Sequence, residues 1–128
     1  MWEASASYPC ATTSPADARQ FCAQSLTAKL GHTTSAQELI GTAQMIVSEL
    51  LTNSVDAVCG HTELTLSIHD HLLRIAVRDD APGIPTLRNP EAVEARGRGL
   101  MIVAALAAGW GVEPFPHGKQ VWAELVLP

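Results

Sequence analysis

Two oxygen-bearing side chains lie one helical turn apart in the segment SELLTNSVDAV, residues 48–58. If this segment is helical, Glu49 and Asn53 share one face, and Asp56 follows about one turn further along. A carboxylate beside an amide oxygen suits a hydrated Mg²⁺, a hard cation that takes oxygen ligands and keeps several waters. A solvated helix edge would show the same residues, so the pair indicates a magnesium site only in combination with other signals.

A second candidate site follows an apolar strand in the segment VRDDAPGIP, residues 77–85. An acidic residue at the end of a buried strand places a carboxylate at the floor of a pocket, where Asp79 would accept a hydrogen bond from an amino group. The alternative is local turn chemistry, because Asp, Pro and Gly favour turns for reasons of their own. The residue pattern leaves both interpretations open.

A third candidate site is the segment Gly97-Arg98-Gly99-Leu100, which opens an apolar helix. Glycines let a ligand approach the backbone, and the free N–H groups and the dipole of a helix start favour phosphate. A flexible loop end has the same composition, so the position before a helix is what favours a phosphate site. His69 and His71, by contrast, are interpreted as polar turn residues, because no third metal ligand is near them in the sequence.

These candidate residues must be positioned by elements that the hydrophobic pattern indicates. Apolar residues recur at helical spacing from Ile40 to Val58, after a capping box of Ser35 and Glu38. Alternating apolar residues then predict an antiparallel hairpin. The predicted order is a strand over 4–8, helices over 16–30 and about 35–60, a hairpin over 63–78, a long loop over 79–98, a helix over 100–108, and strands over 110–115 and 120–127.

The whole chain, residues 1–128, is expected to form one domain of the α+β class. Strand pairs joined by tight turns predict a mixed, mostly antiparallel sheet, and the amphipathic helices should cover one of its faces. The fold class is therefore a two-layer α/β sandwich.

Composition excludes several classes of partner. The net charge is −5 and no cluster of Lys or Arg is present, which argues against direct binding of nucleic acid. The longest uncharged run, residues 99–112, is too short to span a bilayer, so no membrane association is expected. The three cysteines are irregularly spaced without a CxxC motif, which indicates reduced thiols and a cytoplasmic protein.

The order of the three candidate motifs is more specific than any of them alone. Glu-x-x-x-Asn on a helix, Asp-x-x-x-Gly after a strand and Gly-x-Gly-Leu at a helix start resemble the GHKL, or Bergerat-fold, ATP-binding domain. Sensor histidine kinases, DNA gyrase and anti-sigma-factor kinases carry such domains. The segments IVSELLTNSVDA, VRDDAPGIP, GRGLMIVAALAAGWGV and GKQVWAEL most resemble the small stand-alone anti-sigma-factor serine kinases.

The resemblance implies ATP and Mg²⁺ as cofactors and gives each motif a role. Asn53 would bind the Mg²⁺ that bridges the phosphates, and Glu49 would orient or deprotonate the attacking hydroxyl or water. Asp79 would accept the adenine amino group, and Gly83 would let the chain turn over the base. Residues 84–98 would form a lid. The phosphate-binding residues implied by the last motif are Gly97, Arg98, Gly99 and Leu100.

The resemblance also implies a function and partners. The chain would be a Mg-ATP-dependent serine/threonine kinase that phosphorylates a small antagonist protein of an anti-sigma factor, regulating transcription by partner switching. It would hold a sigma factor as a further partner and would form a homodimer. The alternative is a regulatory module that binds ATP and sequesters a protein without transferring phosphate.

Several residues depart from the family pattern or have no secure place in it. Ala81 stands where many relatives have the first glycine of the adenine loop, and Asp80 stands where relatives often have Asn. Arg96 and Arg98 are candidates for contact with the γ-phosphate or, equally, solvated arginines, and Lys119 has a weaker claim to such contact.

Overall fold

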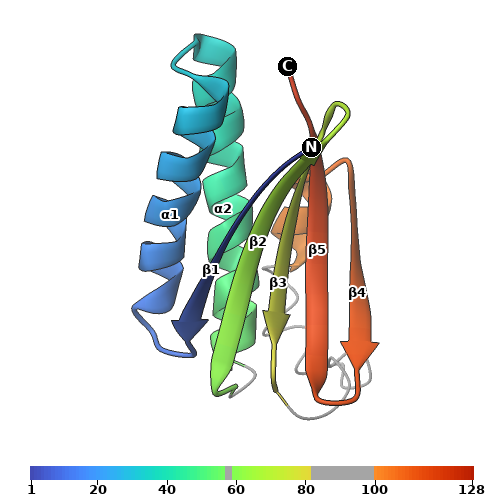
Figure 1. Cartoon of the computed structure of the whole chain (residues 1–128). Helices are drawn as coiled ribbons and strands as arrows, with labels where there is room; N and C mark the ends of the chain where they lie inside the picture. The colour runs from blue at the N-terminus through green and yellow to red at the C-terminus, as the bar shows by residue number, and fades with distance from the viewer. Residues whose placement is uncertain (57–58, 82–99) are drawn as a thin grey trace.

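The computed structural model describes residues 1–56, 59–81 and 100–128, and it shows two layers (Figure 1). Helices lie along one face of a five-stranded sheet, whose strand order is β1-β2-β3-β5-β4 with every neighbouring pair antiparallel. The predicted α+β sandwich is confirmed. The elements are β1 (Trp2–Pro9), α1 (Ser14–Leu30), α2 (Thr34–Asp56), β2 (His61–His69), β3 (Leu72–Asp79), a helical stretch over 100–106, β4 (Gly109–Phe115) and β5 (Gly118–Val126).

The central hairpin forms as its alternating sequence predicts. In β2 and β3 one set of side chains is buried against the helices, as with Leu66 opposite Ile75, and the other set lies on the open face of the sheet. The turn between the strands contains Asp70 at φ 56°, a conformation that Asp tolerates better than most residues.

The two long helices begin earlier than the sequence indicates. α1 starts at Ser14 because Pro15 fits the first turn of a helix, where no N–H partner is lost. α2 starts at Thr34, and the N–H of Ala36 donates to the hydroxyl of Thr33 at 3.2 Å. The predicted capping box at Ser35 is therefore wrong, because the residue that caps α2 is Thr33.

The core lies between the helices and the inner face of the sheet. The predicted α2 stripe is buried from Ile40 to Ser54, and Ile46, which the stripe did not include, is fully buried with it. Val103 adds the C-terminal helical stretch to the same core. None of the helices in the described ranges is long and apolar enough to cross a membrane.

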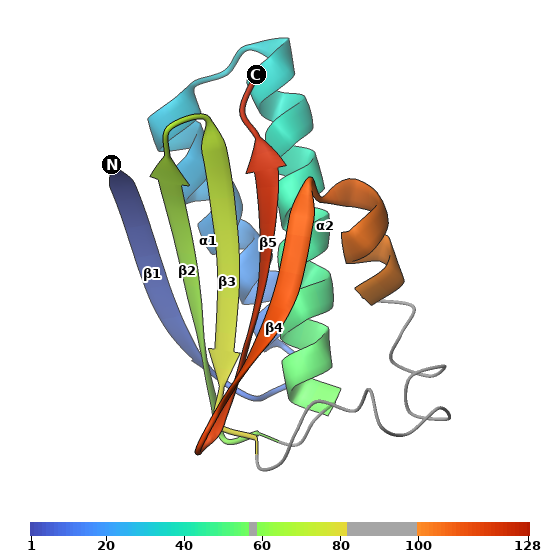
Figure 2. The same ribbon diagram turned by 90° about the vertical axis from the view of Figure 1, so that its right-hand side faces the viewer.

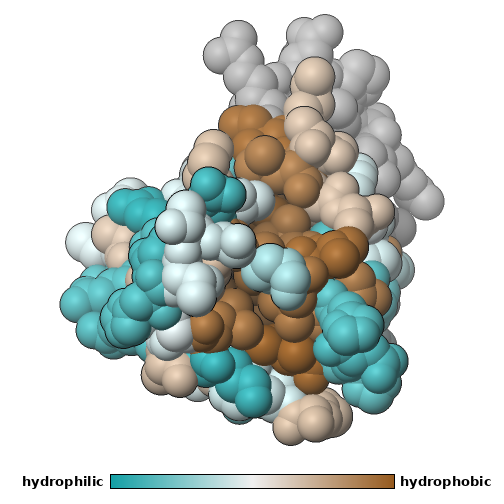
Figure 3. All heavy atoms as spheres, turned by 90° about the horizontal axis from the view of Figure 1, so that it is seen from above, coloured by the Kyte–Doolittle hydropathy of each residue, from teal (hydrophilic) through white to brown (hydrophobic). Residues whose placement is uncertain are grey.

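The two ends of this sandwich differ. Both termini and the β2–β3 turn lie at one end, and viewed from there the surface shows an apolar band flanked by hydrophilic regions (Figure 3). At the other end lie the last turns of α2, the end of β3 and the start of β5 (Figures 1 and 2). The candidate site residues Glu49, Asn53 and Asp79 lie in the elements that meet at this second end.

Candidate functional site

Glu49 and Asn53 project from the last turns of α2 on the side that faces away from α1. The side of α2 toward α1 is fixed by two hydrogen bonds, from Arg19 to the Ser48 hydroxyl at 2.8 Å and from Gln44 to the Arg19 carbonyl at 3.2 Å. At 3.6 residues per turn, Glu49 and Asn53 lie well around the helix from that side. Both are half-buried. The helical stretch over 100–106 and α1 lie on opposite sides of α2 (Figure 2).

This pair fits the chemistry of a hydrated magnesium ion. Both side chains offer oxygen atoms, and Mg²⁺ in proteins is commonly held by one or two such ligands together with water and substrate phosphates. In the described ranges no group of three His, Cys, Asp or Glu side chains forms a complete metal site. Glu49 and Asn53 thus offer two of the oxygen ligands that such an ion takes.

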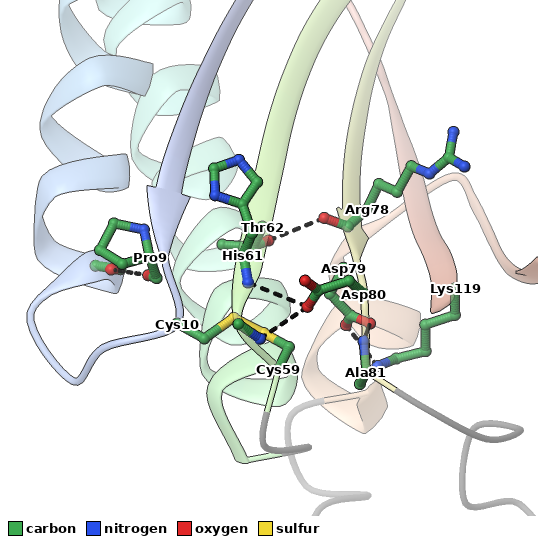
Figure 4. Close-up of a disulfide and its surroundings, with 12 residues drawn as sticks. Pro9, Cys10, Cys59, His61, Thr62, Arg78, Asp79, Asp80, Ala81 and Lys119 are labelled. Carbon is green, nitrogen blue, oxygen red and sulfur yellow. Dashed lines mark hydrogen bonds and ion pairs between the residues drawn. A yellow bond between two sulfur atoms is a disulfide. The ribbon is translucent and has the colours of Figure 1, made fainter. Parts of the chain in front are cut away.

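Asp79 ends β3 with its carboxylate buried and held from two directions (Figure 4). One carboxylate oxygen accepts the N–H of Ala81 at 3.1 Å, and the other lies 2.6 Å from the ammonium of Lys119. The two residues are directly opposite in the β3–β5 register. Lys119 is expected from the sequence at most to contact phosphate, but in the structure its ammonium pairs with Asp79, the residue predicted to bind the base.

Asp80 points away from Asp79 and binds the backbone at the start of β2. Its carboxylate accepts the N–H groups of Gly60 at 2.8 Å and His61 at 3.1 Å. These backbone hydrogen bonds hold the pKa of Asp80 below its ordinary value. Because the folded pKa is lowered, the stability that Asp80 contributes is present above the unfolded pKa of about 3.9 and is lost as the pH falls through the folded value.

A disulfide closes the same end of the molecule and corrects the prediction of reduced thiols. Cys10, just after β1, is joined to Cys59, just before β2, with their Cα atoms 5.6 Å apart (Figure 4). The pairing of Pro9 with His61 brings the two cysteines together. Cys22 is a free thiol in the core, where burial raises its pKa to about 12.

Replacing both Cys10 and Cys59 with serine should lower the free energy of unfolding by about 2–4 kcal/mol under non-reducing conditions, because the cross-link restricts a long loop in the unfolded chain. Urea denaturation with and without reductant measures this. The reductant should destabilise the wild type and leave the double variant unchanged. The disulfide would be contradicted if the urea midpoint of the wild type did not change with reductant and the denatured protein had three titratable thiols.

The remaining predicted site residues divide into two groups. Leu100 is half-buried and packs against the core at the beginning of the described part of its helix. Ala81 is buried beside Asp79, and its N–H donates a hydrogen bond to the Asp79 carboxylate. The predicted residues that lie outside the described ranges are Gly83, Gly97, Arg98 and Gly99, together with Arg96 and the segment over 84–98.

Comparison with known proteins shows the family to which this sequence belongs. The sequence profile of the histidine kinase-like ATPase domain matches residues 11–125. Comparison with curated proteins gives no match.

Two solved structures share the fold. One is a blue-light activated histidine kinase of Erythrobacter litoralis EL346, with 23% identity and a TM-score of 0.57 over 84% of this chain and 40% of that one. The other is the histidine kinase domain from the same blue-light activated kinase, with 22% identity and a TM-score of 0.54 over 93% of this chain and 61% of that one. This chain thus spans less than two thirds of either structure.

Proposed function

We propose a function for this chain from one premise: it belongs to the histidine kinase-like ATPase domain family. We infer that it is a Mg-ATP-dependent serine/threonine kinase of the anti-sigma-factor type. Its substrate would be a small antagonist protein, and phosphorylation of that protein would switch the partner of the kinase and so regulate transcription.

The observation that carries this proposal is the meeting of the candidate residues at one end of the sandwich. α2 brings Glu49 and Asn53 there, and β3 brings the buried carboxylate of Asp79. The fixed carboxylate of Asp79 suits recognition of an amino group on a base. The side-chain oxygens of Glu49 and Asn53, on the neighbouring helix α2, suit a magnesium ion bound to phosphates. The separation of these two chemistries supports a nucleotide that lies with its base near β3 and its phosphates near α2.

In this arrangement the residues of the chain bind and orient the reactants. Asp79 would accept a hydrogen bond from the base, and Asn53 would hold the magnesium ion with its amide oxygen. The ion, when bound, would neutralise charge that develops on the phosphates. Glu49 would orient the serine or threonine hydroxyl of the antagonist and accept its proton.

Asn53→Ala should weaken ATP binding roughly tenfold in the presence of Mg²⁺ and leave it unchanged in EDTA. A tenfold loss corresponds to about 1.4 kcal/mol, which is near the value of one interaction with a charged group. Calorimetric titration measures both conditions. Thr52→Ala, at an exposed neighbouring position on α2, is the matched control. If Asn53→Ala binds ATP with the wild-type dependence on Mg²⁺, the residue is not a magnesium ligand.

Phosphotransfer itself is tested with ATP labelled on its γ-phosphate. The purified chain would be incubated with candidate small antagonist proteins, and the label would be located by mass spectrometry. Label on one serine or threonine of one antagonist supports the kinase function. If ATP binds and a stable complex with the antagonist forms while no label moves, the regulatory module that binds without phosphotransfer takes its place.

A further inference from the structure

Lys119 is a buried lysine that forms an ion pair with the buried carboxylate of Asp79. It lies near the start of β5 with 5% of its surface exposed, and its ammonium is 2.6 Å from Asp79. A buried ammonium requires a partner, because an unpaired charge in the interior is strongly unfavourable. The pair therefore places a cationic donor and an anionic acceptor side by side, at the end of β3 and the start of β5 (Figure 4).

We propose that Lys119 reads the nucleotide base together with Asp79, and that the pair allows guanine to bind as well as adenine. This inference rests on the proposed function, since it takes the end of β3 as the base site. It goes beyond that function because it changes which nucleotides the site accepts.

The complementarity follows from the edges of the two bases. Adenine has an amino donor beside the ring acceptor N1, and so can donate to Asp79 while it accepts from Lys119. Guanine has a carbonyl acceptor beside the ring donor N1–H, and so can accept from Lys119 while it donates to Asp79. The two protein groups are 2.6 Å apart, so a small sideways shift of the base exchanges the partners.

Without Lys119, the site would discriminate between adenine and guanine. A carboxylate alone accepts the adenine amino group, but when it accepts N1–H from guanine the neighbouring guanine carbonyl is left without a donor. Lys119 supplies that donor, because its ammonium carries three N–H groups and only one is needed for Asp79. The buried lysine thus converts a site selective for adenine into one that accepts both purines.

The test is calorimetric titration of the wild-type chain with Mg-ATP, Mg-GTP and the triphosphate of 1-deazaadenosine, which lacks the ring acceptor. We expect GTP to bind within about tenfold of ATP and 1-deaza-ATP to bind about tenfold more weakly than ATP. GTP more than a hundredfold weaker than ATP, or 1-deaza-ATP equal to ATP, would overturn the role of Lys119 and leave ATP binding intact. Failure of all three nucleotides to bind would overturn the proposed function as well.

Two variants add an independent measurement. Lys119→Met keeps the length of the side chain without the donor and should raise the ratio of the GTP to the ATP dissociation constant at least tenfold, whereas Lys119→Arg should keep it near the wild-type value. Circular dichroism reports whether each variant folds. An unchanged ratio in folded Lys119→Met contradicts the inference, and if that variant does not fold, the 1-deaza-ATP titration of the wild type decides.

Discussion

Glu49→Gln is expected to reduce phosphotransfer by a factor of about 10²–10⁴ while leaving the affinity for Mg-ATP within about twofold. Glutamine keeps the shape of the side chain but cannot accept a proton. Glu49 is half-buried on the side of α2 that faces away from α1, so the substitution leaves the packing between the two helices in place. The measurement pairs transfer of labelled phosphate to the antagonist with calorimetric titration of ATP.

A matched control separates this role from a general effect of removing charge from α2. Glu38→Gln changes an exposed carboxylate in the first turns of the same helix and should leave both readouts at the wild-type value. Full transfer activity in Glu49→Gln would exclude Glu49 as the proton acceptor. Equal loss of transfer and of ATP affinity would instead assign it to nucleotide binding.

Gly118→Ala is expected to lower the free energy of unfolding by about 3 kcal/mol, the sum expected for an unfavourable backbone conformation and an overpacked contact. Gly118 has φ +141°, which L residues rarely adopt. A Cβ there would collide with the carbonyl oxygen of Asp79 and lie 3.0 Å from the Cα of Asp80. Both are backbone atoms at the candidate site, so they cannot move without disturbing the pairing of β3 with β5.

Urea denaturation measures this loss, and Gly41 provides the control. Gly41 lies in α2, and no atom outside its own helical turn lies within 4 Å of the place that a Cβ would take. Gly41→Ala should therefore stabilise the protein by about 0.5–1 kcal/mol. Should Gly118→Ala be tolerated as well as Gly41→Ala, the close approach of the β4–β5 turn to Asp79 would be wrong.

Local sequence patterns predicted the elements that carry the site. The alternation around Leu64 and Ile75 was enough for the hairpin, because a strand with one buried face repeats every two residues. The helical spacing of Ile40, Val47 and Leu50 was likewise enough for α2, and with it the shared face of Glu49 and Asn53. The cap of α2 was misplaced because Thr33 and Ser35 are both suitable capping residues.

Features that depend on distant parts of the chain were not predictable in this way. The pairing of Asp79 with Lys119 requires β5 to lie beside β3, although β4 intervenes in the sequence. The disulfide requires the end of β1 to meet the start of β2 across α1 and α2, and the spacing of Cys10 and Cys59 carries no sign of it. In both cases the missing information was the order of strands in the sheet, which hydrophobic periodicity does not contain.

The most direct test of the central claim is calorimetric titration of the purified chain with ATP, with Mg²⁺ and again with EDTA. The arrangement of Glu49, Asn53 and Asp79 predicts saturable binding at one site per chain, weakened when the metal is removed. Absence of binding in both conditions would contradict a nucleotide site at this end of the sandwich. The chain would then be better explained as a member of the family that acts through protein binding alone.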